Sequence, residues 1–135
     1  MKINRLRNNR CYLAGAMEKD ADILKGMEAI SGVADGLDEE LQSGNLSWKH
    51  IGQYLNEEWA ARKSLFKVHT KRLDEIMQFL GARKILGAKV CGAAAGGSIL
   101  VLVDPGQKDH LAEDCEKHGI KVLSTKATRE GVFSK

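Results

Sequence analysis

The chain has 135 residues and a mass of 14.8 kDa, enough for one domain with one hydrophobic core and too short for two. Charged residues make up 29% and hydrophobic residues 43%, proportions that exclude a disordered tail, a collagen-like repeat and a disulfide scaffold. The formal net charge is only +3, which does not by itself indicate nucleic acid or a membrane as a partner.

The cysteines indicate a reducing compartment. Cys11, Cys91 and Cys115 lie far apart, form no CxxC pair and are odd in number, so we expect free thiols in the cytoplasm. Cysteines and histidines together show no zinc-binding spacing, so no metal site is expected. No apolar run approaches the roughly 20 residues of a membrane span, and no apolar segment of a signal peptide follows the basic start.

Residues 1–19 are basic and show little periodicity, with Lys2, Arg5, Arg7 and Arg10 in the first ten positions. We expect an N-terminal basic arm here, either a frayed edge segment with a short strand at 11–13 or an arm that touches phosphate. No linker divides the remainder, so residues 20–135 are expected to form a single domain.

A first helix is predicted over residues 20–43, with Asp20 or Asp22 as the N-cap and Ser43-Gly44-Asn45 as the stop. Glycines at 26, 32 and 36 each cost roughly 1 kcal/mol relative to alanine, so we expect them to allow close packing against a neighbouring helix. Apolar residues at steps of three and four give this helix one buried face, namely Ala21, Leu24, Met27, Ile30, Ala34, Leu37 and Leu41.

A second helix is predicted over residues 48–66, capped by Ser47, with Trp48 and Trp59 in the core. Its solvent side is expected to carry acid-before-base pairs formed by Glu57, Glu58, Arg62 and Lys63. Thr70 caps a third helix, and short connections favour antiparallel neighbours. The inward face of the third helix is predicted to hold Leu73, Ile76, Met77 and Leu80, and surface positions are predicted for His50, His69, His110 and His118.

After Gly87 the pattern changes to strands. Strands are predicted at residues 89–91, 98–103, 120–123 and 127–132, with both faces of 98–103 at least partly covered because the run is continuously apolar. A turn at 104–106 and a helix at 107–118, stopped by Gly119, separate the second strand from the third. The predicted fold class is α+β, with an antiparallel sheet of about four strands and helices on one face.

Residues 92–97 read GAAAGG between two predicted strands. Small residues let a backbone approach an anion closely, and a run of unobstructed amides can form a nest for phosphate oxygens. A tight hairpin is the alternative interpretation. The segment is not a P-loop, since no Lys-Ser/Thr follows the glycines, and it is not a dinucleotide fingerprint, since a strand follows it.

Residues 87–103, GAKVCGAAAGGSILVLV, resemble the third conserved motif of the GHMP small-molecule kinases. That motif typically reads Gly-Ala/Gly-Lys-x-Ser/Cys-Gly-Ala-Gly-Gly-Gly-Gly before a strand. Residues 55–65, LNEEWAARKSL, look like the sugar-kinase branch that includes heptose-phosphate kinases. The resemblance covers residues 20–132 and implies the family's C-terminal domain, a ferredoxin-like sandwich with an added helical hairpin.

The resemblance implies a loop that closes over the nucleotide phosphates and the acceptor, formed by Gly92, Ala93, Ala94, Ala95, Gly96 and Gly97. Supporting roles fall to three residues. Lys89 either reaches a phosphate or lies in solvent at the end of a strand. Arg62 faces either the substrate or the solvent. Cys91 either donates a weak hydrogen bond to the loop or packs as a small apolar side chain.

Alanines 94 and 95 depart from the family's motif, which usually has glycine at both positions. Each would cost about 1 kcal/mol or more if its φ were positive. A methyl group at either position could also block the approach of a phosphate, so weakened or lost nucleotide contact is an open alternative.

The family's phosphate loop, Pro-x-x-x-Gly-Leu-Gly-Ser-Ser, lies in its N-terminal domain and has no counterpart in this sequence. The resemblance therefore implies a fragment, split half or degenerate relative of an ATP- and Mg²⁺-dependent kinase. Such a chain is inactive alone and needs a partner with the phosphate loop. The alternative is a stand-alone regulatory module that self-associates. An RNA-binding sheet would need exposed aromatics, and this half offers only Phe133, so no nucleic-acid partner is expected.

Overall fold

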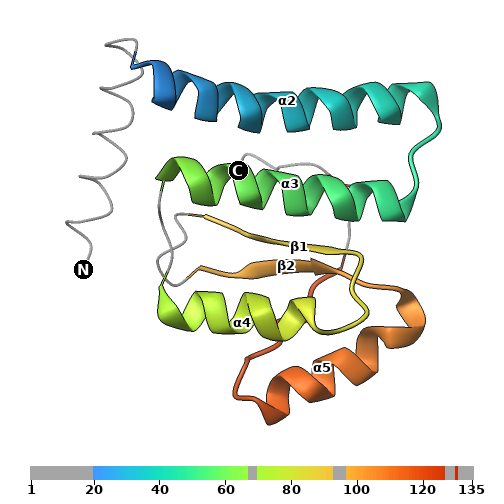
Figure 1. The fold of residues 1–135 in the computed structure, drawn as a ribbon. Coiled ribbons are helices and arrows are strands. Elements are labelled where there is room, and N and C mark those ends of the chain that lie inside the picture. The colour runs from blue at the N-terminus through green and yellow to red at the C-terminus, as the bar shows by residue number, and fades with distance from the viewer. Residues whose placement is uncertain (1–19, 67–69, 93–96, 127–129, 131–135) are drawn as a thin grey trace.

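The structure is a computed structural model that describes residues 20–66, 70–92, 97–126 and 130. The predicted basic arm at 1–19, its short strand and His69 lie outside the described residues. The α+β class is confirmed (Figure 1). The described elements, in chain order, are α2 (Ala21–Ser43), α3 (Trp48–Phe66), α4 (Lys71–Gly81), β1 (Gly87–Val90), β2 (Ile99–Leu102), the 3₁₀ turn η1 (Pro105–Gln107) and α5 (Lys108–Lys117).

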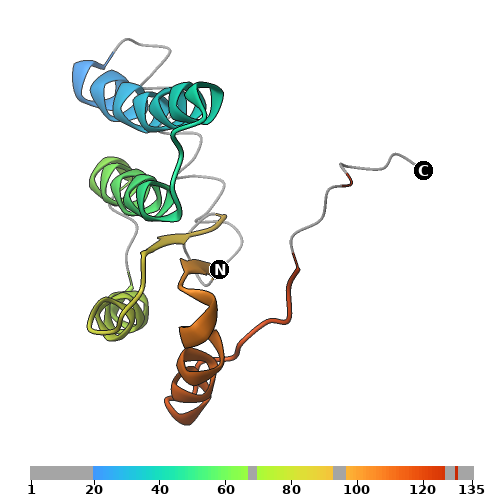
Figure 2. The ribbon, with the colours of Figure 1, turned by 90° about the vertical axis from the view of Figure 1, so that its right-hand side faces the viewer.

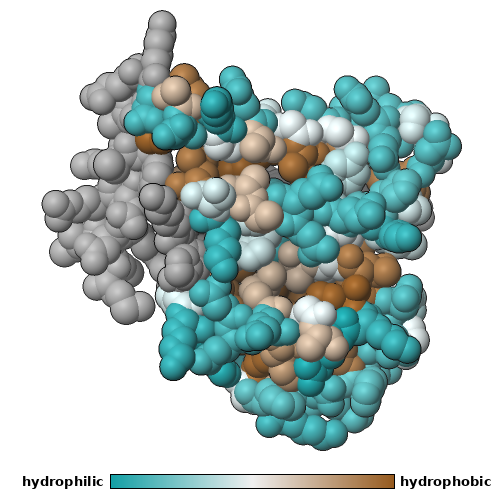
Figure 3. All heavy atoms as spheres, viewed as in Figure 1, coloured by the Kyte–Doolittle hydropathy of each residue, from teal (hydrophilic) through white to brown (hydrophobic). Residues whose placement is uncertain are grey.

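The elements stack in layers. Helices α2 and α3 lie side by side, the β1–β2 hairpin follows beside α3, and α4 and α5 lie beyond the hairpin (Figures 1 and 2). Hydrophobic residues gather in bands between these layers, while the outer sides of the helices are hydrophilic (Figure 3). The central core joins three layers through Trp59, Leu73 and Val90, with Met77 and Ile99 packed against them. The predicted core position of Trp59 is confirmed.

Helix α2 begins and ends as its sequence predicts. The Asp20 carboxylate accepts hydrogen bonds from the N–H groups of Asp22 and Ile23 at 3.0 and 3.2 Å, and Gly44 ends the helix at φ 75°. The helix nevertheless has no fully buried residue. Its predicted apolar face is wrong in part, because Ala21, Ala34 and Leu41 are exposed on a helix that rests against one neighbouring helix.

The glycines of α2 serve close packing at two of three positions. A Cβ at Gly26 would meet the Leu65 side chain at 2.5 Å, and one at Gly36 would meet the Tyr54 ring at 3.2 Å. A Cβ at Gly32 would meet nothing within 4 Å, so packing does not explain this glycine.

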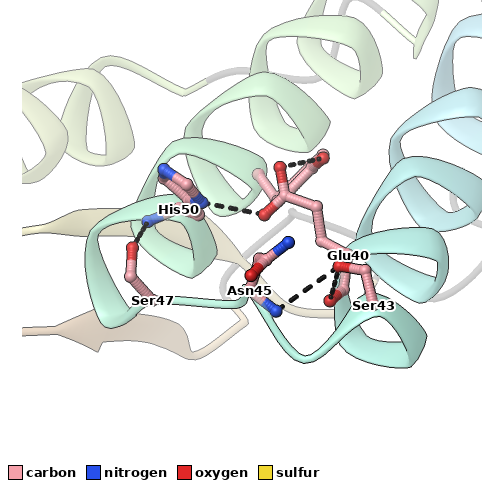
Figure 4. Close-up of polar contacts among 6 residues, drawn as sticks. Glu40, Ser43, Asn45, Ser47 and His50 are labelled. Atoms are coloured by element: carbon pink, nitrogen blue, oxygen red, sulfur yellow. Dashed lines mark hydrogen bonds and ion pairs between the residues drawn. The ribbon is translucent and has the colours of Figure 1, made fainter.

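Polar contacts fasten the turn between α2 and α3 (Figure 4). Glu40 on α2 accepts a hydrogen bond from Tyr54 Oη at 3.2 Å, and its other oxygen lies 2.9 Å from His50 Nδ1. Ser47 caps α3 by accepting from the His50 N–H at 3.2 Å. Trp48, the first residue of α3, is 69% exposed, so its predicted core position is wrong: helical periodicity places it on the apolar stripe, but no described element covers this end of the helix.

Helix α4 confirms its predicted inner face. Thr70 caps it by accepting from the Leu73 N–H at 3.2 Å, and Leu73 and Leu80 are buried. Helix α5 ends as predicted, at Gly119 with φ 70°. His110 and His118 are exposed, as expected.

The described sheet has two antiparallel strands, in the register Gly87↔Leu102 to Val90↔Ile99. The strand predicted at 120–123 is wrong, because residues 120–126 form no strand and run away from the helices (Figure 2). A strand needs a partner edge, which a local apolar pattern does not provide. Most of the strand predicted at 127–132 lies outside the described residues, so a four-stranded ferredoxin-like sheet is not confirmed.

The two faces of the hairpin differ in coverage. Ala88 and Val90 are 1% and 0% exposed on the face that meets the core. On the other face Leu100 is 52% exposed but Leu102 is half-buried, so this face is partly covered, as predicted, and more open than the face of Ala88 and Val90. Of the four residues of β2, only Leu100 is exposed, and the other three are half-buried.

Candidate functional site

Helix α3 lies against the edge of β1 at backbone distance. A Cβ at Gly52 would overlap the carbonyl oxygen of Leu86, and a Cβ at Gly87 would overlap the carbonyl oxygen of Gly52. The Ala88 N–H, which points away from β2, donates to Asn56 Oδ1 at 3.0 Å. Helix α3 thus satisfies the strand edge that would otherwise be open to pairing.

Two residues after Asn56 on α3, Glu58 also joins the helix to the strand. It is 8% exposed, and its Oε1 accepts from Arg62 Nε at 2.7 Å and also from Arg62 Nη2. Lys89 Nζ, from β1, lies 2.9 Å from Glu58 Oε2, although that oxygen accepts no aligned hydrogen bond. We call Glu58, Arg62 and Lys89 the charge cluster.

The charge cluster brings together two predicted site residues, Arg62 and Lys89, that are 27 positions apart in the numbering. Neither side chain is fully solvated, at 28% and 23% exposure. Two cations share one carboxylate, so the cluster keeps an excess positive charge. An ammonium group has three donors, and Glu58 faces only one side of it, which leaves Lys89 able to contact an anion as well.

Glu58 is the residue that sequence reasoning missed. Its spacing of four from Arg62 predicts an acid–base pair, which is confirmed. The prediction that this pair faces solvent is wrong for Glu58, because β1 packs over that side of the helix. Lys89, three residues before the glycine loop, is the signal that would have pointed to a buried carboxylate partner.

The glycine loop begins at Gly92, three residues after Lys89. The Cys91 N–H donates to the Ser98 carbonyl at 2.8 Å and closes the hairpin at the base of the loop. Gly92 has φ 70°, and a Cβ at Gly97 would overlap the Cys91 carbonyl oxygen, so both ends of the loop require glycine. Cys91 is half-buried. Ala93, Ala94, Ala95 and Gly96 lie outside the described residues, so the nest of amides and the backbone of the alanines stay predictions.

The described part of the chain offers neither a metal site nor a membrane span. Among the residues that the structure describes, no group of three His, Cys, Asp or Glu side chains could hold a metal ion. None of the helices in that part of the chain is long and apolar enough to cross a membrane.

Comparison with known proteins places these features in a family. A family model described as "GHMP kinases C terminal" matches residues 39–121, which span the end of α2 through α5 and include α3, the charge cluster and the glycine loop. No curated protein and no solved structure gives a significant match. Because the match covers more than half of the chain, the chain belongs to the GHMP kinase C-terminal family.

Proposed function

We propose that this chain supplies one wall of the active site of an ATP-dependent sugar or sugar-phosphate kinase, of the branch that includes heptose-phosphate kinases. The observation that carries the proposal is the excess positive charge of the charge cluster, whose Lys89 lies three residues before a loop whose ends require glycine. The family match supports the kinase class. The branch rests on the resemblance of residues 55–65.

The described residues fit a phosphate ligand. Positive φ at Gly92 and the absence of side chains at Gly92 and Gly97 leave the loop backbone accessible at both ends. When bound, ATP with Mg²⁺ supplies the phosphoryl group and the metal charge. Lys89 would then place its ammonium group against the phosphates, held in position by Glu58, while Arg62 neutralises the other oxygen of that carboxylate. Such positioning and charge stabilisation are the main contributions of a protein to phosphoryl transfer.

The proposed chain needs a phosphate-loop domain, whether that domain precedes it in the same polypeptide or comes from a partner, and we place the assembled kinase in the cytoplasm. The 135-residue chain alone is expected to phosphorylate no sugar or sugar phosphate. A radiolabelled ATP assay at stoichiometric enzyme concentration tests this expectation. Sugar phosphorylation by the purified chain would contradict it.

Nucleotide contact can be tested separately from turnover. A ¹H–¹⁵N correlation titration of the full chain with ATP and Mg²⁺ should shift the amides of Lys89, Cys91, Gly92, Gly97 and Ser98. Lys89→Gln should weaken the binding about 5-fold, as expected for one partly exposed charge contact. The exposed Lys117→Gln is the matched control and should change nothing. Unaltered binding by Lys89→Gln would contradict the proposed role of this lysine.

The loop alanines offer a second variant of the same titration. If Ala94 and Ala95 obstruct the phosphates, replacing both with glycine should tighten ATP binding relative to the unmodified chain. Equal affinity in the two proteins would show that the methyl groups do not limit nucleotide contact.

A non-catalytic module that self-associates is the second candidate. The observation that favours it is the open face of the hairpin, where Leu100 is 52% exposed. Sedimentation of the full chain should then show a dimer, and Leu100→Lys should shift it to monomer. A monomer at all concentrations would contradict this candidate without affecting the kinase proposal.

A further inference from the structure

A pocket of about 340 Å³ lies at the end of the hairpin remote from the glycine loop. It is formed where α4 passes into β1 and where β2 passes through η1 into α5 (Figure 1). Each strand has four residues, so roughly 13 Å of hairpin separates this pocket from Cys91 and Ser98. The volume is within the range of small-molecule sites, which is roughly 300–1,000 Å³.

The polar groups of the pocket carry an excess of positive charge. Its carboxylate, Asp114, is already neutralised, because Arg83 Nε donates to Asp114 Oδ2 at 3.2 Å. Arg83 is held rigidly as well, since Nη1 donates to the Phe79 carbonyl at 2.7 Å and the guanidinium carbon lies 3.3 Å from the centre of the Phe79 ring. The ammonium group of Lys84 has no partner among the described residues and remains as the uncompensated charge.

Other donors point to the same class of ligand. Arg83 Nη2 has no hydrogen-bond partner among the residues that the structure describes, and the exposed imidazole of His110 can donate a hydrogen bond in either tautomer. Gln107, the N-cap residue of α5, also lines the pocket, and its side chain makes no capping hydrogen bond to the first turn of the helix. The remaining lining is apolar and comes from Ala82, Ile85, Val103 and Leu111.

We propose that this pocket binds a small organic anion, a phosphate or carboxylate group carried on an apolar skeleton. The acid group contacts Lys84, His110 and Arg83 Nη2, and the skeleton covers the apolar lining. Because the pocket shares no residue with the glycine loop or the charge cluster, the proposal stands or falls independently of the kinase function.

The test uses the full chain and phenyl phosphate as the probe, in a ¹H–¹⁵N correlation titration. We expect saturable shifts of the amides of residues 83–85, 107, 110 and 111, with an affinity of about 1 mM for a probe of this size. Inorganic phosphate, which lacks the skeleton, and benzyl alcohol, which lacks the charge, should each bind at least about 5-fold more weakly. Equal binding of either one would overturn the proposed ligand class.

The variants are placed at exposed positions, Lys84 and His110, so that a change in binding does not result from unfolding of the chain. Lys84→Gln and His110→Gln should each weaken phenyl phosphate binding about 3- to 5-fold, as for exposed charge and hydrogen-bond contacts. Lys117→Gln, at the far end of α5, should leave it unchanged. Full affinity in the double variant Lys84→Gln/His110→Gln, or shifts confined to residues 91–98, would overturn the proposal.

Discussion

Helix α3 makes two different interfaces, and the comparison explains how this domain is stabilised. Toward α2 the contact is made by side chains, and no residue of α2 is fully buried. Toward β1 the contact is made by backbone, through Gly52 and Gly87, with Ala88 and Val90 almost completely buried beside it. The first interface can adjust by moving side chains, whereas the second cannot, because main-chain atoms already touch.

Adding a side chain at the backbone contact between α3 and β1 should have the greatest effect on the free energy of unfolding. Gly52→Ala places a methyl group onto the Leu86 carbonyl oxygen and should destabilise the chain by about 3 kcal/mol or more. Gly32→Ala is the matched control, since its Cβ has open space in the same kind of helix interior and should stabilise by up to about 1 kcal/mol. Urea unfolding measures both variants. A mild effect of Gly52→Ala would mean that α3 can move away from β1 at little cost.

Next in size is the loss of the buried carboxylate. Glu58→Gln leaves Arg62 and Lys89 facing each other without a counter-charge and should cost about 3 kcal/mol. Adding Lys89→Gln should recover part of this loss, because one of the two unpaired cations is removed. A double-mutant cycle in urea measures the coupling, with the exposed Glu57→Gln as control. Additive effects in the cycle would argue that Glu58 and Lys89 do not interact.

A smaller effect is expected at the side-chain interface. Glu40→Ala removes the acceptor of Tyr54 and the partner of His50, both partly exposed, and should cost about 1 kcal/mol. Glu28→Ala, exposed on the same helix, should be nearly neutral. The change should appear chiefly as faster amide exchange in α2, with the protection of β1 preserved. Equal loss of protection in both layers would show that the domain unfolds only as one unit.

The last and weakest effect concerns pH. Burial, followed by the hydrogen bond to Glu40, raises the pKa of Tyr54 above 10.0. The folded state therefore holds this proton more tightly than the unfolded chain. The resulting stability is complete below about pH 10 and is lost as pH rises through the folded pKa. Tyr54→Phe should flatten the decline of the urea midpoint above about pH 10, and an identical decline in both proteins would contradict this linkage.

Helices and their ends were the most predictable part of the fold, since each signal is local. Asp20, Ser47 and Thr70 cap their helices as predicted, and Gly44 and Gly119 take the positive φ expected of helix stops. Strands were less predictable. The pattern at residues 98–103 became β2, whereas the similar apolar pattern at 120–123 did not become a strand, because pairing depends on a partner edge that periodicity does not reveal.

The candidate site likewise has residues that the sequence predicted and one that it did not. Lys89, Arg62 and the glycines were recognisable from spacing and family resemblance. The sequence did not show which carboxylate pairs with Lys89. Glu57 and Glu58 are adjacent glutamates on α3, and only the side of the helix that faces β1 distinguishes them. The packing of α3 against β1, in backbone contact at Gly52 and Gly87, places Glu58 beside the strand.

Local sequence was enough to predict the helices of the described region, the caps of α2, α3 and α4 and the membership of a kinase family, because these features depend on neighbours a few residues apart or on a continuous motif. The exposure of Trp48, the burial of Glu58 and the pocket at the far end of the hairpin followed only from the tertiary structure. Those outcomes depend on which surfaces meet across the layers. So the 135 residues, balanced in composition and with a net charge of only +3, carry two separate groups of positive charge. Arg83 and Lys84 are neighbours in the sequence, whereas Arg62 and Lys89 are brought together only by the fold.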